Sequence, residues 1–337
     1  MKAVYASGVS ADNPLSMLKV GAMPDPVERE LWSTVSVKAA SLNHHDLWSL
    51  AGVGLSKDAT PMILGTDAAG VLDQDLPAPG GHGLSAGSPV VLYTLVGGDQ
   101  AGVGPGERRS ILSERYPGTM AQRASVPSAH LLPKPPNLSF GEAAALGTSW
   151  LTAYSMLFSA AAVKPGDSIL IQGAGGGVST AALQLAHAAG IEVFVSSRSQ
   201  DHRDKALSLG ADLAVETGAR LPRKVDAVIE SVGAATWSHS VKSVRPGGVI
   251  AVCGATTGDQ PGAELTRVFF QDIRIVGNTM GSLGDFARLL RFVEHAGIHP
   301  VIDSVYALDQ APQAFSKLAG GRVFGKIVLD VDGADQR

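Results

Sequence analysis

The sequence predicts an α/β protein of two domains, one rich in β-strands and one built on a doubly wound parallel sheet. With 337 residues, 45% of them hydrophobic, the chain is long enough to divide into about two domains. The proline-rich segment Pro133–Asn137 is typical of a stiff connector, and the sequence pattern changes after it. Short apolar strands then alternate with amphipathic helices, which is the pattern of a parallel sheet covered by helices.

The residues before the connector favour strands and loops. Leu31–Lys38 alternates in polarity, with Val35 and Val37 on one face, and Ser88–Val96 is a second β-rich run. Near the end of the chain, Phe286–Glu294 is amphipathic and Phe324–Asp330 is a predicted strand. Because the partners of this last strand could lie in the first domain, we expect the two domains to be interwoven.

The residues after the connector predict the parallel sheet. Strands are predicted at Ser168–Gln172, Glu192–Ser196, Val225–Glu230, Gly248–Cys253 and Ile273–Gly277, and helices at Val178–Ala189, Gln200–Leu209 and Thr236–Val244.

The overall charge and the single cysteine exclude several classes of protein. The formal net charge of -4 offers no basic field for nucleic acid or an anionic membrane surface. No apolar run reaches the roughly 18 residues that a spanning helix needs, so a cytoplasmic location is expected. Cys253 is the only cysteine, which excludes an internal disulfide and a four-cysteine zinc site.

A glycine-rich loop follows the strand Ser168–Gln172 directly and leads into a helix. It runs Gly173-Ala174-Gly175-Gly176-Gly177-Val178. Glycines allow a sharp turn and a close approach of the backbone to a pyrophosphate, whose charge the N-terminus of the next helix stabilises. We therefore favour a dinucleotide site over a turn that needs glycine for its conformation alone.

The tip of the next strand indicates which dinucleotide is bound. An NAD enzyme usually has Asp or Glu there, about 20 residues after the loop, whereas this chain has Ser196-Ser197-Arg198. Two hydroxyls and a guanidinium favour a 2′-phosphate, so we predict NADPH, with NADH possible. The alternative is that Arg198 is only a solvated loop arginine.

These residues together resemble the medium-chain dehydrogenase/reductase family, and in particular its zinc-free, quinone-oxidoreductase-like branch. The matching motifs, in chain order, are Ser41–Asp46, Leu64–Gly70, Thr152–Tyr154, Ala174–Ser179, Arg245–Gly248 and Phe324–Val328. The resemblance implies a GroES-like β catalytic domain at residues 1–145 together with 282–337, and a Rossmann domain at residues 146–281. It also implies an oligomer, for which we expect a homodimer.

Departures from the zinc-dependent branch of the family predict that no zinc is bound. Asn43 and Thr66 stand where that branch has a cysteine and a histidine as zinc ligands, and Gly97–Gly118, where its cysteine-rich lobe would fall, contains no cysteine. A metal site at the consecutive donors His44, His45 and Asp46 is the alternative, but neighbouring side chains project in different directions. Ser179 replaces the third glycine of the family loop, and it is small enough to keep the pyrophosphate site.

The resemblance also implies roles for individual residues. We expect Asn43, Asp46, Thr66 and Thr152 to orient the reactants, although Asp46 could only brace the fold and Thr152 could only pack a helix. His45 is the first candidate proton donor, because imidazole titrates near neutral pH, and Tyr93 is the second. Cofactor binding is assigned to Ala174, Gly175, Gly176, Gly177, Val178, Ser179, Ser196, Ser197, Arg198, Gly254, Ala255, Thr256, Asn278 and Lys326. Apolar candidates for the substrate pocket, each of which could instead be core, are Trp48, Leu50, Met62 and Phe270.

The expected activity is hydride transfer from NADPH to a small acceptor without a metal. A quinone or an α,β-unsaturated carbonyl spreads the incoming negative charge, so it needs less electrophilic help than a plain ketone. Two other functions remain open, namely an alcohol or aldehyde dehydrogenase using NAD(P) and a non-enzymatic NADPH-binding sensor. The acidic composition argues against RNA as a partner.

Overall fold

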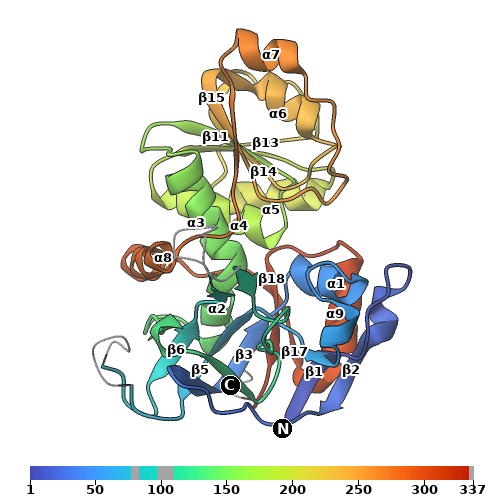
Figure 1. The fold of residues 1–337 in the computed structure, drawn as a ribbon. Coiled ribbons are helices and arrows are strands. Elements are labelled where there is room, and N and C mark those ends of the chain that lie inside the picture. The colour runs from blue at the N-terminus through green and yellow to red at the C-terminus, as the bar shows by residue number, and fades with distance from the viewer. Residues whose placement is uncertain (77–82, 98–108, 334–337) are drawn as a thin grey trace. The chain divides into compact units, whose positions relative to one another are not determined.

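The computed structural model describes residues 1–76, 83–97 and 109–333 and divides the chain into two compact units (Figure 1). The first unit comprises Met1–Thr148 and Ser282–Arg337, and the second comprises Ser149–Gly281.

The second unit is built on a six-stranded parallel sheet with the order β13-β12-β11-β14-β15-β16. Its strands are β11 Ser168–Gln172, β12 Glu192–Ser196, β13 Leu213–Val215, β14 Val225–Glu230, β15 Val244–Val252 and β16 Arg274–Gly277. Its α-helices are α3 Leu151–Ser155, α4 Gly177–Ala188, α5 Gln200–Ser208, α6 Trp237–Ser243 and α7 Leu265–Phe270. This parallel order confirms the predicted α/β class.

The central strand β11 of this sheet is buried along its whole length. All five residues of β11 are buried, between β12 on one side and β14 on the other. Such a strand lies under helices on both faces and therefore has a continuous apolar sequence instead of an alternating one. The order of the strands also reverses at β11, and in open sheets of this kind ligands bind at the carboxyl ends of the strands near such a point.

The first unit contains a seven-stranded sheet with the order β10-β6-β5-β3-β18-β17, and β9 pairs with β3 outside this path. The strands are β3 Trp32–Ser41, β5 Asp67–Leu72, β6 Pro89–Leu92, β9 Arg123–Pro127, β10 Leu131–Pro133, β17 Ile302–Ala307 and β18 Lys326–Asp330. β18 pairs antiparallel with β3, so the last part of the chain completes the sheet of the first unit.

Two smaller sheets and four α-helices complete the first unit. The smaller sheets have the orders β2-β1-β4 and β7-β8. Their strands are β1 Lys2–Ala6, β2 Leu18–Ala22, β4 Met62–Ile63, β7 Leu95–Val96 and β8 Ser110–Ile111, and the helices are α1 His44–Ala51, α2 Phe140–Ala144, α8 Leu283–Ala296 and α9 Ala311–Ala319.

Among the differences between the structure and the sequence-based expectation in the first unit, two concern Ser88–Val96 and His44–Ala51. The predicted strand Ser88–Val96 is divided into β6 and β7, because the chain leaves the large sheet after Leu92 and pairs with β8 from Leu95. In addition, His44–Ala51 forms α1, a helix that the pattern did not predict. Within the described ranges, none of the helices combines the length and the apolar character needed to cross a bilayer.

Candidate active site

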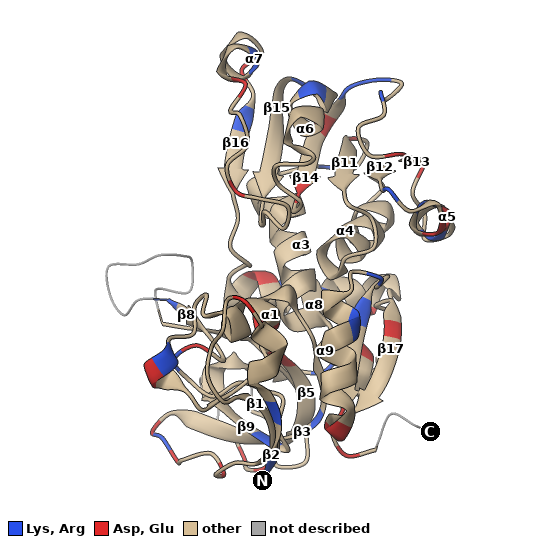
Figure 2. Ribbon diagram, turned by 90° about the vertical axis from the view of Figure 1, so that its right-hand side faces the viewer, with Lys and Arg blue, Asp and Glu red and all other residues tan. Residues whose placement is uncertain are grey.

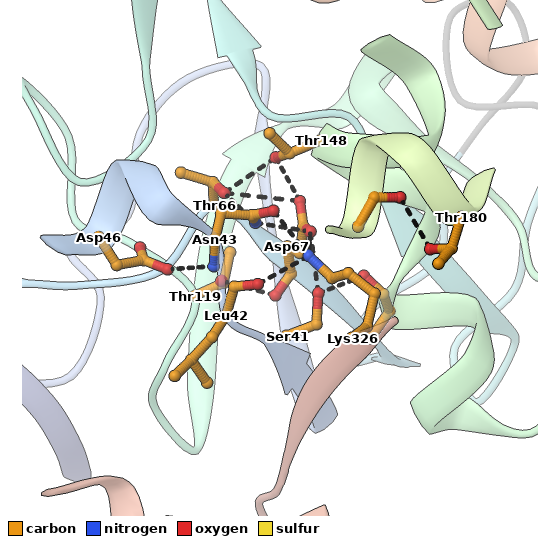
Figure 3. Close-up of polar contacts among 12 residues, drawn as sticks. Ser41, Leu42, Asn43, Asp46, Thr66, Asp67, Thr119, Thr148, Thr180 and Lys326 are labelled. Carbon is orange, nitrogen blue, oxygen red and sulfur yellow. Dashed lines mark hydrogen bonds and ion pairs between the residues drawn. The ribbon is translucent and has the colours of Figure 1, made fainter. Parts of the chain in front are cut away.

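A buried polar network in the first unit surrounds the carboxylate of Asp67 (Figure 3). Asp67 opens β5, directly after Thr66, while Ser41 closes β3 and Asn43 precedes α1. Because β3 and β5 are antiparallel and Ser41 pairs with Asp67, the end of one strand lies beside the start of the other. Lys326, the first residue of β18, completes the network.

The ammonium of Lys326 is the cation of this network. It donates to the carbonyl oxygen of Leu42 at 2.7 Å, to Oδ1 of Asn43 at 2.6 Å and to Oδ2 of Asp67 at 3.4 Å. The Lys326 side chain is only 3% exposed and that of Asp67 is fully buried. Burial lowers the pKa of Lys326, whereas the nearby charges of Asp67 and Asp46 act against this effect.

The amide of Asn43 is held on both sides. Oδ1 accepts from Lys326, and Nδ2 donates to Oγ1 of Thr66 at 3.0 Å and to Oδ2 of Asp67 at 2.8 Å. Oγ1 of Thr66 lies 2.9 Å from Oγ1 of Thr148, which in turn donates to Oδ1 of Asp67. The structure thus brings together Asn43, Thr66 and Lys326, and adds Asp67 and Thr148, for which no role was predicted.

Asp46 lies at the edge of this network and caps α1. Its Oδ2 accepts from the backbone N–H of Asn43 at 2.7 Å, while its Oδ1 is buried with no hydrogen-bond partner. Burial raises the pKa of the Asp46 carboxyl to about 6, against the lowering effects of His45 and the Asn43 N–H.

His45 forms an ion pair that the sequence did not predict. Its Nε2 lies 3.1 Å from Oε1 of Glu114, and its Nδ1 lies 3.5 Å from Oγ of Ser49. Oε2 of Glu114 accepts from Ser110 and from the backbone of Ile111. Burial alone would raise the pKa of Glu114, but the hydrogen bond and charge of His45 lower it below its usual value. Glu114 is 69 residues from His45, so no short motif could reveal the pair.

Tyr93 lies in an aromatic cluster. Its ring packs edge-on against His130 at 5.1 Å between centroids and lies 6.1 Å from that of Phe286. Burial raises the pKa of Tyr93 to about 12 and lowers that of His130 to about 4. Tyr93 thus keeps its proton at neutral pH, and its ring contacts with His130 and Phe286 lie outside the network around Asp67.

The side chains at the two family zinc-ligand positions do not fit a zinc ion. An amide and a hydroxyl are poor zinc ligands, and both are engaged in hydrogen bonds inside the network. The Lys326 ammonium, 2.6 Å from Asn43 Oδ1, would also repel a second cation. Across residues 1–76, 83–97 and 109–333, no three His, Cys, Asp or Glu side chains lie close enough to hold a metal.

The glycine loop of the second unit has the geometry of a dinucleotide site. It connects β11 to α4, whose first N–H groups have no partner within the helix and can bind an anion. Gly175 has a φ of +121°, and a Cβ there would lie 2.4 Å from Nδ1 of His202. Ser179, in place of the third family glycine, donates to the carbonyl of Gly173 at 2.8 Å, so its hydroxyl is satisfied locally.

The loop is fixed to the end of β12, where the ribose would be recognised. The N–H of Ala174 donates to the carbonyl of Ser196, and the Ser196 hydroxyl donates to Gln172. Ser197 is also buried, whereas Arg198 is exposed and leads into α5, along which acidic and basic residues are interspersed (Figure 2). Of the three residues predicted there, Arg198 is therefore the one whose side chain can reach a ligand from solvent.

A buried carboxylate for which no role was predicted accepts several hydrogen bonds in this unit. Glu230, at the end of β14, accepts from the N–H groups of Val232 and Gly233 and from the hydroxyls of Thr236 and Ser240. Ser240 also accepts from Gln172, so the network continues to Ser196 beside the glycine loop.

The remaining cofactor candidates divide between the two units. Gly254, Ala255 and Thr256 follow the end of β15 and are at least partly exposed. The Asn278 amide donates to the carbonyl of Met280 and accepts from Ser155, which fits a role in turning the chain. Lys326, which the sequence assigned to the cofactor, lies in the first unit with the network around Asp67.

The other expected side chains lie in different surroundings. Thr152 is buried in α3 of the second unit. Leu50 and Met62 belong to the core of the first unit, whereas Trp48 and Phe270 are 40% and 76% exposed.

Comparison with known proteins identifies the family. Residues 29–136 match the family model of the alcohol dehydrogenase GroES-like domain, and residues 177–295 match that of zinc-binding dehydrogenases. A 2-methylene-furan-3-one reductase of Solanum lycopersicum is 32% identical over 317 residues, 91% of this chain and 73% of that protein. The quinone oxidoreductase of Mus musculus is 27% identical, with 90% of each chain covered.

A solved structure agrees with these matches over the whole chain. The crystal structure of an NAD-dependent alcohol dehydrogenase is 34% identical, covers 98% of this chain and 100% of that one, and has a TM-score of 0.88. The chain therefore belongs to the medium-chain dehydrogenase/reductase family, in its quinone-oxidoreductase-like branch.

Proposed function

We propose that the protein is an NADPH-dependent reductase of a quinone or an α,β-unsaturated carbonyl compound that works without a catalytic metal. Membership in the family makes it an NAD(P)H-dependent oxidoreductase. The observation that carries the finer proposal is the buried network around Asp67, in which an amide, two hydroxyls and an ammonium take the place of metal ligands. The names of the tomato and mouse relatives support acceptors of this kind.

In this mechanism a bound NADPH supplies the hydride, and the chain's own groups hold the reactants and supply a proton. The glycine loop and the N-terminus of α4 would hold the pyrophosphate. The side chains of Asn43 and Thr66 are fixed by hydrogen bonds and would keep the acceptor's surroundings polar without reorganisation. His45, 17% exposed and paired with Glu114, would give the proton to the reduced acceptor.

Activity with both cofactors and a panel of acceptors tests this proposal. We expect quinones and enones to be reduced faster than simple ketones and aldehydes, with NADPH preferred over NADH. Arg198→Glu should weaken NADPH binding about tenfold or more and leave NADH binding nearly unchanged, because only NADPH carries the 2′-phosphate. Equal rates with NADH, or an Arg198→Glu variant with normal NADPH affinity, would count against the cofactor assignment.

Elemental analysis separates this proposal from a zinc-dependent alcohol dehydrogenase. The description of one matching family model includes zinc, and a related structure is an alcohol dehydrogenase. We expect purified protein to contain far less than one zinc per chain and to keep its activity with a chelator. Stoichiometric zinc together with activity lost to the chelator would establish the alternative. Tight NADPH binding with no reduced acceptor would instead favour a sensor.

We also propose a homodimer formed through the edge of the second unit's sheet. β16 ends the sheet and has only β15 as a neighbour, so one side of its backbone has no strand partner. Leu265, Phe269 and Phe270 of the adjoining α7 are 61–76% exposed, and Ile275 of β16 is 45% exposed. A two-fold axis would place this apolar edge against its own copy.

The free Cys253 fits a reducing, cytoplasmic location.

A further inference from the structure

The buried ammonium of Lys326 has a geometry that defines its charge. It lies within hydrogen-bonding distance of three oxygen atoms, the Leu42 carbonyl, Asn43 Oδ1 and Asp67 Oδ2. A protonated lysine has three N–H donors, whereas a neutral amine has only two. The three acceptors therefore match the charged form, which also compensates the fully buried carboxylate of Asp67.

This ammonium also determines how the Asn43 amide is oriented. Since Lys326 can only donate, the atom 2.6 Å from it must be the amide oxygen, and the amide nitrogen then faces Thr66 and Asp67. The Asp67 carboxylate can only accept, so Thr148 donates its single proton to Asp67 and accepts from the hydroxyl of Thr66. The ammonium thereby sets the orientation of the Asn43 amide, while the Asp67 carboxylate sets the direction of the hydrogen bonds through Thr148 and Thr66.

We propose that Lys326 is a positioning residue for the reaction, a built-in cation that fixes Asn43 and Thr66 at the positions where zinc-dependent relatives would have metal ligands. Lys326 acts through these side chains and does not touch the substrate. This inference rests on the proposed function, because it assumes that the network takes part in the reaction. The charge of Lys326 and the orientation of the Asn43 amide can be measured separately.

The first experiment measures the charge and the ion pair in the full-length protein without a substrate. In ¹⁵N spectra near pH 7, Lys326 should give a slowly exchanging NH₃⁺ signal that is absent in Lys326→Met. The Tm of Lys326→Met should fall by roughly 10 °C, because Asp67 is left without a counter-charge. Asp67→Asn in the same chain should recover at least half of that loss. Lys317→Met, which removes a partly exposed ion pair with Asp303, is the matched control and should shift Tm by about 3 °C or less.

The second experiment uses the folded double variant Lys326→Met/Asp67→Asn to separate positioning from plain stability. We expect its kcat/KM for the acceptor to fall roughly tenfold to a hundredfold, with the Kd for NADPH within about twofold of the wild type. Adding Asn43→Ala should lower kcat/KM little further, since the amide is already free to turn.

Two outcomes would overturn the inference. One is a wild-type protein in which the Lys326 signal shows a neutral amine at pH 7, and the other is a folded double variant with wild-type kcat/KM, which would leave Lys326 without a positioning role. If the wild type reduces no quinone or enone, the proposed function fails. The NH₃⁺ signal and the recovery of Tm by Asp67→Asn still decide whether the Lys326 ammonium orders the network around Asp67.

Discussion

Asp46 is a carboxyl group whose charged form the folded protein disfavours. Burial raises its pKa to about 6, and one of its oxygens has no hydrogen-bond partner. The folded state therefore binds its proton more tightly than the unfolded state, in which the pKa is near 3.8. This group's contribution to stability is present in full below about pH 4 and is lost as the pH rises through 6.

Asp46→Asn should accordingly become more favourable as the pH rises. Asparagine can still accept from the N–H of Asn43 but carries no charge to bury. We expect the variant to gain on the order of 1–3 kcal/mol relative to the wild type between pH 4 and pH 7, as followed by urea denaturation. A stability difference that is the same at both pH values would show that Asp46 titrates normally.

Replacing His45 should change kcat more than it changes stability. Its partner Glu114 lies in a different segment of the chain, and both side chains are partly exposed. Under the proposed mechanism His45→Ala lowers kcat by roughly a hundredfold, the range for loss of a general acid, and leaves NADPH affinity unchanged. Stopped-flow rates of NADPH oxidation measure the first effect and fluorescence titration the second. An unchanged kcat would remove His45 from the mechanism.

Individual residues were predictable where a motif carries them. Asn43, Asp46 and Thr66 were expected to orient the reactants, a role that stays a prediction, and the structure places all three at the network around Asp67. The observed contacts of Lys326 and His45, in contrast, involve residues 283 and 69 positions away, respectively. Such pairings are set by the way strands meet in the sheet and leave no local pattern in the sequence.

At the scale of elements, the turn after β14 depends on a single carboxylate. Glu230 satisfies two backbone N–H groups and two hydroxyls in a place that water does not reach. Glu230→Ala should therefore cost about 3 kcal/mol or more, because these donors lose their acceptor. Calorimetry measures the loss. The exposed Glu216 offers a control, and a Glu230→Ala protein as stable as Glu216→Ala would refute this account.

The glycine loop offers a second comparison between neighbouring positions. At Gly175 a methyl group would meet the His202 ring at 2.4 Å on a backbone with φ of +121°, whereas at Gly176 the nearest atom is 3.7 Å away. We expect Gly175→Ala to lose about 1–3 kcal/mol of stability without cofactor and Gly176→Ala less than about 1 kcal/mol. Thermal unfolding distinguishes the two, and equal losses would mean that the loop tolerates a side chain at both positions.

The elements of the second unit were predicted well because their sequences are continuous apolar runs bounded by glycine and polar residues. β11, β12 and β14 have the predicted bounds. β15 begins at Val244, four residues before the predicted start, because Pro246 and the following glycines suggest a turn although Val244 pairs with Val225. In the first unit, short strands change sheets within two residues, as between β6 and β7, which periodicity over a longer window does not detect.

At the scale of the whole molecule, the proposed dimer makes a measurable prediction. A single chain has a mass of 34.6 kDa, so light scattering should give twice that value for the wild type. Ile275→Lys combined with Phe270→Asp should give monomers, because charges would replace the apolar edge. Val27→Lys, at a 74% exposed position in the first unit, is the control and should remain dimeric. A wild type that is monomeric at micromolar concentration would refute this interface.

The place of β18 in the sheet of the first unit has a consequence for synthesis on the ribosome. A nascent chain that has emerged only as far as Gly281 contains the whole second unit and Asp67, but not Lys326. Lys326 is synthesised 259 residues after Asp67. Until the last strand arrives, a buried aspartate has no counter-charge and β3 has an open edge. The network around Asp67 therefore cannot form until β18 has been synthesised. A prematurely terminated product would be a target for chaperones and proteases rather than a partly active enzyme.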